Sequence, residues 1–419
     1  MKKAAQPPIR ARGTVASRTY QRATMKLDHI ECINLLFDYP ERHGFESSGG
    51  ITSSRVTSLI LVHTDRGEVG IGSAYSHPGL VQLVVQQLSA LLRGHDVSDV
   101  EAVWEKMYGW TRWFGRKGAA MSALGGIDVA LWDLRGKALQ KPVWKLLGGI
   151  EASCPAYASA LLWNSFDGLA AEAVGHLERG FRRMKMRLGK NEEYDTGAVQ
   201  AVRRAIGPEH DLMCDASMRY HLTLARRIGR TLTDNRVFWF EEPFQPEDLD
   251  SFAALRSTVR VPVAAGENEF GTQGFRELIE RQAVDILQAD ASRCGGLTEV
   301  RRVAEMVAKA GLKLAPHSWS DAVAIVANAQ VVASTPEALT VEVDQTGNPF
   351  VDDLLLEPLT IKEGRLQLSH APGLGIELNP QTVTRLRMAD QLSVPDGRYS
   401  DMVFGQLETL PAGPYRERT

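Results

Sequence analysis

Three acidic residues stand at equal intervals along the chain, each at the end of a short apolar run. Asp215 and Glu241 are 26 residues apart, and Glu267 follows after another 26 (241 − 215 and 267 − 241). That interval is about the length of one strand and one helix, so we expect the acids at equivalent strand ends. Gathered carboxylates repel one another, and an oxygen-rich site suits Mg²⁺. The three acids therefore predict one shared Mg²⁺ ion.

The same spacing brings further titratable residues to the same predicted edge. Lys185 and Arg187 end an earlier strand candidate, one strand-plus-helix unit before Asp215. After Glu267 the intervals to Asp290, His317 and Glu342 are 23, 27 and 25 residues. A chance scatter of charges would not keep step with the strand period. We therefore treat these residues as one constellation.

These residue types can remove a proton from a carbon next to a carboxylate. A cation on the three acids would hold the substrate carboxylate and stabilise the charge that develops when the proton leaves. Lys185 would add positive charge. Asp290 can hold His317 in the tautomer that leaves its other ring nitrogen free as a base. The set predicts proton abstraction next to a carboxylate.

The elements that must position these residues alternate between strand and helix from residue 154 onward. Parallel strands result from such alternation, and eight of them favour a closed α/β barrel. An open doubly wound sheet is the alternative, but it usually has a Gly-rich phosphate turn after its first strand, and none follows Ala160. The expected strands are 154–160, 183–187, 212–215, 237–241, 261–265, 286–289, 313–316 and 339–343. The expected helices are 168–179, 196–206, 222–234, 249–257, 272–280, 296–310 and 322–334.

The chain before residue 150 has a different pattern, typical of an α+β unit. Strands are expected over 30–37, 58–64 and 69–74, and helices over 80–92, 100–107 and 119–139. The Gly- and Ser-rich segment 38–54 is expected to be a mobile loop. We predict a disordered extension over 1–24, a capping domain over 25–150, a barrel over 151–375, and a C-terminal segment over 376–419 that packs back on the capping domain.

Bulk composition excludes several classes of protein. Of the 419 residues 44% are hydrophobic, and the net charge of −3 gives no indication of a nucleic-acid partner. The four cysteines are far apart, which indicates reduced thiols and not a disulfide framework or zinc site. No apolar run approaches the roughly 20 residues of a membrane span, and the N-terminus lacks the apolar segment of a secretory signal. We expect a cytoplasmic protein with no membrane partner.

Seven motifs together carry a family resemblance over about residues 25–400. The chain resembles the enolase superfamily and, within it, the mandelate racemase subgroup. Any one of the motifs alone is weak, and the set is specific. They are Gly125-Gly126-Ile127-Asp128-Val129-Ala130-Leu131-Trp132-Asp133-Leu134 with Gly136-Lys137-Ala138, Lys185-Met186-Arg187, Cys214-Asp215, Phe240-Glu241-Glu242-Pro243, Ala265-Gly266-Glu267-Asn268, Ala289-Asp290 and Pro316-His317.

The resemblance implies an N-terminal α+β capping domain and a (β/α)7β TIM-like barrel. It also implies Mg²⁺ on the three equally spaced acids, a His317–Asp290 pair as base, and Glu342 as partner of the substrate carboxylate or the enediolate. Muconate-lactonising and dipeptide-epimerase relatives have a lysine at the end of the sixth strand, where this chain has Ala291-Ser292-Arg293. Enolase itself lacks the His–Asp pair. Relatives are commonly homo-oligomers, so we expect one here.

Arg187 departs from the racemase pattern, in which a second lysine stands at that position as the opposite base. A guanidinium with a pKa above 12 is a poor proton shuttle. Elimination needs only one base, so we favour a Mg²⁺-dependent dehydratase of an acid sugar, an aldonate or aldarate. His317 would take the C2 proton and the 3-hydroxyl would leave, giving a 2-keto-3-deoxy acid. Alternatives are a racemase or epimerase that uses both Arg187 and His317, and a binding role on an inherited barrel.

Several residues have simpler interpretations. Arg187 is equally consistent with substrate contact and a structural ion pair, Asp344 competes with Glu342 on the same strand, and Glu242 suits the start of a helix. The substrate is expected to be a small carboxylate recognised mainly by loops of the cap. The candidates for substrate contact are His43, Tyr75, His77, Trp163 and Asn268.

Overall fold

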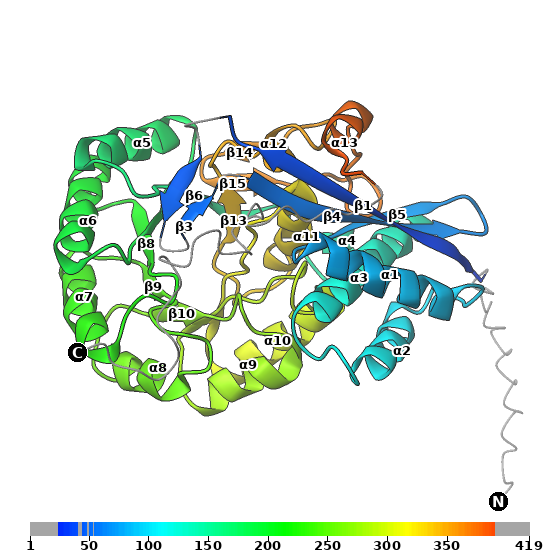
Figure 1. Cartoon of the computed structure of the whole chain (residues 1–419), viewed down its shortest axis with the longest axis horizontal. Helices are drawn as coiled ribbons and strands as arrows, with labels where there is room; N and C mark the ends of the chain where they lie inside the picture. The colour runs from blue at the N-terminus through cyan, green and yellow to red at the C-terminus, as the bar shows by residue number, and fades with distance from the viewer. Residues whose placement is uncertain (1–23, 41–43, 48–49, 53, 390–419) are drawn as a thin grey trace, which may run out of the picture.

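The computed structural model describes residues 24–40, 44–47, 50–52 and 54–389. Figure 1 shows a ring of helices around a barrel, with a layer of strands and helices from the N-terminal part of the chain packed against one side. The predicted combination of an α+β capping unit and an α/β barrel is confirmed. The predicted substrate contact His43 lies outside the described residues.

The N-terminal part contains an antiparallel sheet covered by helices. Its strands have the order β1-β4-β5, so the chain runs out and back as an ordinary meander. The helices follow as the sequence predicts. The elements are β1 (Leu27–Asp38), β4 (Ser54–Thr64), β5 (Val69–Ala74), α1 (Pro78–Leu92), α2 (Val100–Thr111) and α3 (Ala119–Ala138).

Part of the segment expected to be loop forms a short antiparallel hairpin, so that prediction was wrong for these residues. The hairpin consists of β2 (Phe45–Ser47) and β3 (Gly50–Thr52). Strands of three residues are too short to show an alternating pattern. The hairpin lies over the barrel mouth, because Trp163 N donates to Glu46 O at 3.3 Å and Phe45 meets Trp319 edge-on with ring centroids 6.4 Å apart.

The barrel consists of eight parallel strands with a helix between each successive pair. β13 pairs with β6, and Leu314 and Ala338 form the bridge that closes β12 against the approach to β13. The strands are β6 (Ser153–Ser159), β7 (Arg183–Arg187), β8 (Asp211–Asp215), β9 (Trp239–Glu241), β10 (Val263–Ala265), β11 (Ile286–Leu287), β12 (Lys313–Leu314) and β13 (Val341–Asp344). The helices are α5 (Phe166–Glu178), α6 (Glu192–Ile206), α7 (Leu222–Asp234), α8 (Leu249–Arg256), α9 (Gly271–Glu280), α10 (Gly296–Ala310) and α11 (Ala322–Val332).

The barrel interior is filled by an apolar layer that ends just below the candidate site. Its residues are nearly all fully buried and come from six strand positions: Tyr157, Met213, Trp239, Ala264, Ile286 and Ala315. Side chains of a strand alternate between its two faces. Two positions after Met213, Trp239 and Ala315 the inward side chain is therefore that of a residue predicted for the site. The apolar layer therefore lies directly beneath the candidate site.

The glycine-rich helix α3 joins the capping sheet to the barrel. A Cβ on Gly72 would collide with the carbonyl oxygen of Gly126, so strand and helix approach as closely as backbones allow. On the barrel side, Asp128 accepts hydrogen bonds from Thr298 N at 2.9 Å and Thr298 Oγ1 at 2.6 Å. This motif therefore fixes the two units against each other.

The chain after the barrel adds small elements that the sequence did not predict. β15 pairs antiparallel with β6, and after α13 the backbone returns to the capping sheet, where Met388 N donates to Asn34 O at 2.8 Å. The elements added after the barrel are α12 (Pro349–Asp352), β14 (Ile361–Lys362), β15 (Arg365–Gln367) and α13 (Pro380–Leu386). A further short helix, α4 (Val143–Leu146), stands before the barrel.

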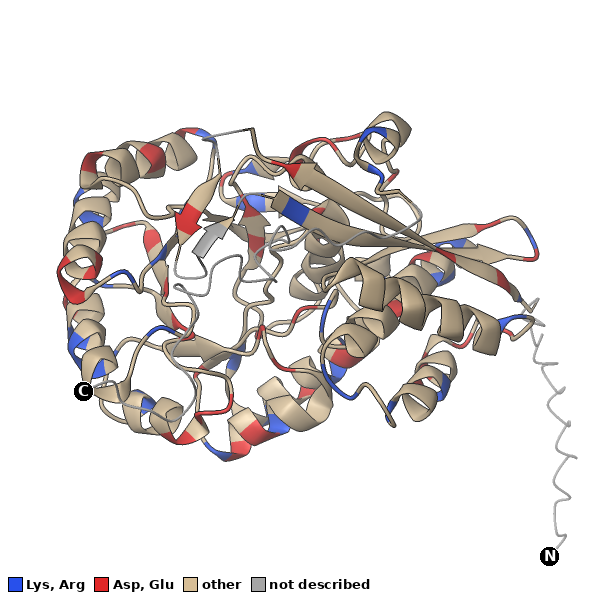
Figure 2. Ribbon diagram, in the orientation of Figure 1, with Lys and Arg blue, Asp and Glu red and all other residues tan. Residues whose placement is uncertain are grey.

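The described helices include none long and apolar enough to cross a membrane. Acidic and basic residues are interspersed along the outer barrel helices (Figure 2). All four cysteines are free thiols, as the sequence predicts.

Candidate active site

The three equally spaced acids meet at one point of the barrel rim. Asp215 is the last residue of β8 and pairs in register with Glu241, the last residue of β9. Glu267 stands two residues beyond the end of β10. One carboxylate oxygen from each residue lies within 4.8 Å of the others. The three acids come together because the carboxyl ends of parallel strands reach the same rim of the barrel.

These residues fit a divalent cation bound by oxygen. Among the described residues, Glu267 Oε2 is buried and has no hydrogen-bond partner. Leaving a buried carboxylate oxygen without a partner is costly. An oxygen-only donor set with several carboxylates is the kind that Mg²⁺ prefers. The geometry therefore suits Asp215, Glu241 and Glu267 as Mg²⁺ ligands.

Lys185 reaches into the same cluster from β7. Its Nζ lies 2.6 Å from Glu241 Oε1, 2.9 Å from Glu342 Oε1 and 3.7 Å from Asp215 Oδ2. Burial opposes its charged form, but the carboxylates of Glu241 and Glu342 outweigh burial and raise the Lys185 pKa well above its ordinary value. The residue is therefore a fixed cation beside the acids.

Arg187 lies next to Lys185 on the same face of β7 and is also held as a cation. Its guanidinium forms an ion pair with Asp215. It also lies over the ring of Trp319, with Cζ 4.8 Å from the ring centroid. An arginine that is paired with a carboxylate and stacked on an aromatic ring is a poor proton acceptor.

His317 and Asp290 form the predicted pair. His317 Nδ1 lies 2.8 Å from Asp290 Oδ2, and the imidazole is buried. Burial lowers the His317 pKa, but the carboxylates of Glu267, Glu342 and Asp290 outweigh burial and raise it above its ordinary value. With Nδ1 donating to Asp290, Nε2 is the free nitrogen. It faces the acids, 3.6 Å from Glu267 Oε2 and 3.9 Å from Glu342 Oε2.

Asn328 of α11 holds this pair in place and was missed by the sequence analysis. Its Nδ2 lies 3.0 Å from both Asp290 Oδ1 and the carbonyl oxygen of His317. Ser292 completes the shell, because its backbone N and its Oγ each donate to Asp290 Oδ1 at 2.8 Å. Asp290 is therefore fixed on both oxygens. No sequence signal distinguishes Asn328 from any other polar residue on a helix.

Glu342 and Asp344, two residues apart on β13, have different partners. Glu342 Oε2 accepts a hydrogen bond from Ser318 N at 2.8 Å, and Lys185 contacts its other oxygen. Burial raises the pKa of Glu342, but Lys185, His317 and Arg187 outweigh burial and hold it well below its ordinary value.

Asp344, in contrast, is bound to structural partners. Its Oδ2 accepts from Arg55 Nη2 at 2.8 Å and from Asn348 Nδ2 at 3.0 Å. Arg55 comes from β4 of the capping sheet and is 1% exposed. No sequence pattern pairs a residue of the cap with a barrel strand so distant in the chain. Of the two acids, Glu342 is the one that faces His317, and its role toward substrate stays a prediction.

Glu242 is buried beside the acids in a left-handed backbone conformation, with φ of 37°. Burial raises its pKa well above the ordinary value, and Glu267 and Glu241 raise it further. Its Oε2 accepts from Asn268 Nδ2 at 2.8 Å, and Asn268 Oδ1 accepts from Arg293 Nη2 at 3.0 Å. Both ends of the Asn268 amide are thus engaged by protein, and a substrate contact for Asn268 stays a prediction.

The other predicted substrate contacts lie in different places. Tyr75 is brought to the base, because its ring is nearly parallel to that of His317, with centroids 6.3 Å apart. Trp163 lies under the hairpin and donates through Nε1 to Leu188 O at 3.2 Å. His77 stands directly before α1. Contacts of all three with substrate stay predictions.

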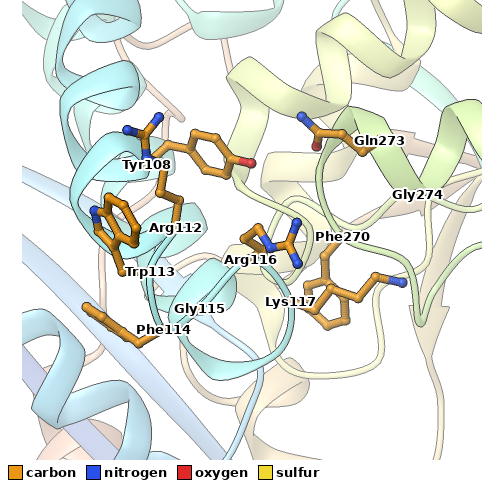
Figure 3. Close-up of a pocket in the computed structure, with 10 residues that line it drawn as sticks. All are labelled: Tyr108, Arg112, Trp113, Phe114, Gly115, Arg116, Lys117, Phe270, Gln273 and Gly274. Atoms are coloured by element: carbon orange, nitrogen blue, oxygen red, sulfur yellow. The ribbon is translucent and has the colours of Figure 1, made fainter.

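A separate cavity of about 470 Å³ lies between the α2–α3 connection and α9. Figure 3 shows Tyr108, Arg116 and Gln273 facing one another across it. None of the sequence-predicted site residues lines this cavity. It is therefore distinct from the barrel-mouth site.

Several proteins named as enzymes of sugar acids are similar to this chain. It is 36% identical to D-galactarolactone cycloisomerase of Agrobacterium fabrum over 83% of this chain and 95% of the relative. It is 32% identical to arabinonate dehydratase of Saccharolobus solfataricus over 75% of this chain and 86% of the relative. The structure of L-talarate/galactarate dehydratase from Salmonella typhimurium LT2, liganded with Mg and L-lyxarohydroxamate, has a TM-score of 0.80 at 26% identity and covers 90% of this chain and 96% of its own.

Family models match both parts of the chain. Residues 35–148 match the mandelate racemase / muconate lactonizing enzyme N-terminal domain, and residues 168–382 match the enolase C-terminal domain-like family. The resemblance seen in the motifs is thereby confirmed, and so is its link to magnesium, since a structural neighbour was solved with that ion. The chain belongs to the enolase superfamily, in the mandelate racemase / muconate lactonizing enzyme family.

Proposed function

We propose that this protein is a Mg²⁺-dependent dehydratase of an acid sugar, an aldonate or an aldarate. The observation that carries the proposal is the unequal state of its two candidate bases. His317 has a free ring nitrogen that faces the acids, and Asp290 holds its other nitrogen at 2.8 Å. Arg187 is ion-paired with Asp215 and stacked on Trp319. A site with one competent base suits elimination better than inversion.

Asp215, Glu241 and Glu267 would hold the Mg²⁺ ion. The bound ion supplies positive charge that stabilises the substrate carboxylate as negative charge builds up on it. Lys185, fully buried and fixed by Glu241 and Glu342, adds a second positive charge beside the acids. These charges are held in place before the reaction begins, so no reorganisation is needed at the transition state.

His317 Nε2 takes the proton from C2 of the substrate, and the electron pair of the C2–H bond moves toward the carboxylate to give an enediolate. Asp290 stabilises the imidazolium through Nδ1. Glu342, anchored by Ser318 N at 2.8 Å, lies 3.9 Å from Nε2 and stabilises the new positive charge on the ring.

The second half of the reaction expels the 3-hydroxyl. The enediolate electrons form the C2–C3 double bond and the C3–O bond breaks. Protonated His317 returns its proton to the departing hydroxyl, which leaves as water. The enol then tautomerises to the 2-keto-3-deoxy acid, so atoms and charge balance with one water released.

A second candidate function is lactone cycloisomerisation, because a curated relative at 36% identity carries that name. The same His317 step would apply, but the oxygen that leaves the carbon next to the deprotonated one would be the ring oxygen of a lactone, which becomes a carboxylate oxygen, in place of a hydroxyl. Nothing is lost from the molecule, and the product is an isomer of the substrate. Racemisation or epimerisation is a third possibility, and it would require Arg187 to exchange a proton.

One screen separates these reactions. The protein would be incubated with Mg²⁺ and a panel of C4 to C6 mono- and diacid sugars and aldarolactones in D₂O, with products analysed by mass spectrometry and NMR. Dehydration gives a 2-keto acid lighter than its substrate by one water. An isomer formed from a lactone would support the cycloisomerase instead. Recovered substrate with inverted configuration and solvent deuterium at C2, and no keto acid, would refute both eliminations.

A further inference from the structure

The loop between β11 and α10, residues 288–295, binds the capping domain through its backbone. The carbonyl oxygen of Ser292 accepts from Tyr75 N at 3.0 Å, and that of Gly295 accepts from Trp104 Nε1 at 2.7 Å. The same loop contains Asp290, the partner of the base. A single loop thus contacts the capping domain and carries Asp290, which holds the candidate base His317.

Arg293 extends this junction to the loop that carries Glu267. The arginine is 6% exposed, and its Cζ lies 5.4 Å from the ring centroid of Tyr75 and 5.8 Å from that of Phe270. Its Nη2 donates to Asn268 Oδ1 at 3.0 Å. The guanidinium therefore contacts an aromatic ring from the cap, an aromatic ring from the start of α9, and the residue directly after Glu267.

Asn268 carries the connection to a second acid. Its Nδ2 donates to Glu242 Oε2 at 2.8 Å, and Glu242 directly follows Glu241. The chain of contacts from Arg293 through Asn268 to Glu242 therefore ends beside two of the three acids that would hold Mg²⁺. The other contact of Arg293, Tyr75, stacks near the base, with its ring centroid 6.3 Å from that of His317.

We propose that Arg293 is a positioning residue that holds the Glu241 and Glu267 loops and the Tyr75 loop in one arrangement. It acts through Asn268 and Tyr75, without touching the reacting atoms. Partners of this kind set the orientation of metal ligands, and removing one typically weakens metal affinity or activity about 10- to 100-fold. The proposal rests on the proposed function only for the assignment of Glu241 and Glu267 as Mg²⁺ ligands.

The test measures Mg²⁺ binding by calorimetry, and kcat and KM on a substrate found in the screen, for Arg293→Met and Arg293→Lys. We expect Arg293→Met to raise the Mg²⁺ Kd about tenfold or more and to lower kcat. Arg293→Lys keeps the charge and one donor, and should fall between Arg293→Met and the wild type. The control is Arg301→Met, because Arg301 also joins the barrel to the cap. Its Nη2 lies 2.5 Å from Glu101 Oε1, and its Cζ lies 5.8 Å from the ring centroid of Trp132. It should leave the Mg²⁺ Kd unchanged.

Asn268→Ala interrupts the same chain of contacts with a smaller change and serves if Arg293→Met fails to fold. It should raise the Mg²⁺ Kd as well, and the double variant should be no worse than the more affected single variant. A wild-type Mg²⁺ Kd in both single variants, or fully additive losses in the double variant, would overturn the proposal. The Mg²⁺ titration needs no substrate, so failure of the dehydratase assignment would leave its outcome intact.

Discussion

Buried carboxylate oxygens in two regions of this protein have different surroundings. Asp128, on helix α3, has both oxygens occupied by neutral donors of Thr298 at 2.6 and 2.9 Å. At the barrel rim, Glu241 contacts the cation Lys185, and Glu267 Oε2 has no hydrogen-bond partner among the described residues. Both oxygens of the helix acid are satisfied by the fold, whereas one buried oxygen of Glu267 is not.

The difference shows how a structural carboxylate can be distinguished from a functional one. Neutral donors can fully satisfy an acid that joins two domains, and burial then raises the Asp128 pKa from 3.8 to about 7. Of the rim acids, Glu241 contacts Lys185, Asp215 pairs with Arg187, and Glu267 keeps one buried oxygen without a hydrogen-bond partner. The same contrast recurs on one strand, where Arg55 and Asn348 occupy Asp344 while Glu342 faces His317.

The largest effect is expected from Glu267→Gln. Removing one of three charged ligands should abolish measurable Mg²⁺ binding and lower turnover about a thousandfold, since the cation is worth several kcal/mol and each 1.36 kcal/mol is tenfold. The fold should persist, because Oε2 has no hydrogen-bond partner to lose. Calorimetric Mg²⁺ titration and turnover would be compared with Glu269→Gln, in which an acid of the same loop paired with Lys117 at 2.8 Å is neutralised. Equal Mg²⁺ affinity of the Glu267→Gln and Glu269→Gln variants would contradict the proposed difference between a metal ligand and a structurally paired acid.

Arg55→Met should lower the free energy of unfolding and leave Mg²⁺ affinity unchanged. It leaves Asp344 buried without its charged partner, and breaking such a pair costs about 3–5 kcal/mol. Chemical denaturation should show this loss, with Mg²⁺ affinity retained by the folded fraction. Glu342→Gln should do the reverse, losing turnover more than stability. The interpretation of these two strand neighbours would be wrong if both variants lost stability equally.

Asp128→Asn should change how stability depends on pH. The Asp128 pKa is raised by burial to about 7 from 3.8, so between these values the folded protein keeps a proton that the unfolded chain has released. Stability from this group is therefore present below about pH 4 and is lost as pH rises toward 7. The shift is worth about 4 kcal/mol, at about 1.36 kcal/mol per pKa unit. Unfolding midpoints from pH 4.5 to 7.5 should fall less steeply in the variant, and an unchanged slope would argue against a protonated Asp128.

The regular spacing of the βα units made the barrel predictable from sequence, but the short elements were not predicted. Apolar runs and helical patterns repeat about every 25 residues, and that repeat alone indicates the βα units. The predicted ends of β11 and β12, Ala289 and Pro316, each lie two residues beyond the end of the observed strand. There the chain leaves the hydrogen-bonded ladder to bring Asp290 and His317 into the site. The hairpin β2–β3 was missed because three-residue strands show no period.

The rim residues were predictable because each follows directly from the strand period. Asn328, Arg55 and Arg293 were not, because they lie on a helix, in the cap and on a loop, and no spacing rule connects such positions with the strand ends. The opposite holds for Asp344, whose place on β13 suggested a role that its contact with Arg55 removes. Sequence thus identifies strand-end chemistry, and only the structure shows which partners hold it.

His317 is the single proposed base beside the Mg²⁺ site, and one variant tests that role directly. For His317→Asn, Mg²⁺ binding by calorimetry and turnover of the best acid sugar in D₂O would be measured beside the wild type. We predict a wild-type Mg²⁺ Kd, turnover lowered by about 10²- to 10⁴-fold, and no deuterium entering C2 of recovered substrate. Near-normal turnover, or deuterium exchange at C2 without His317, would contradict the account.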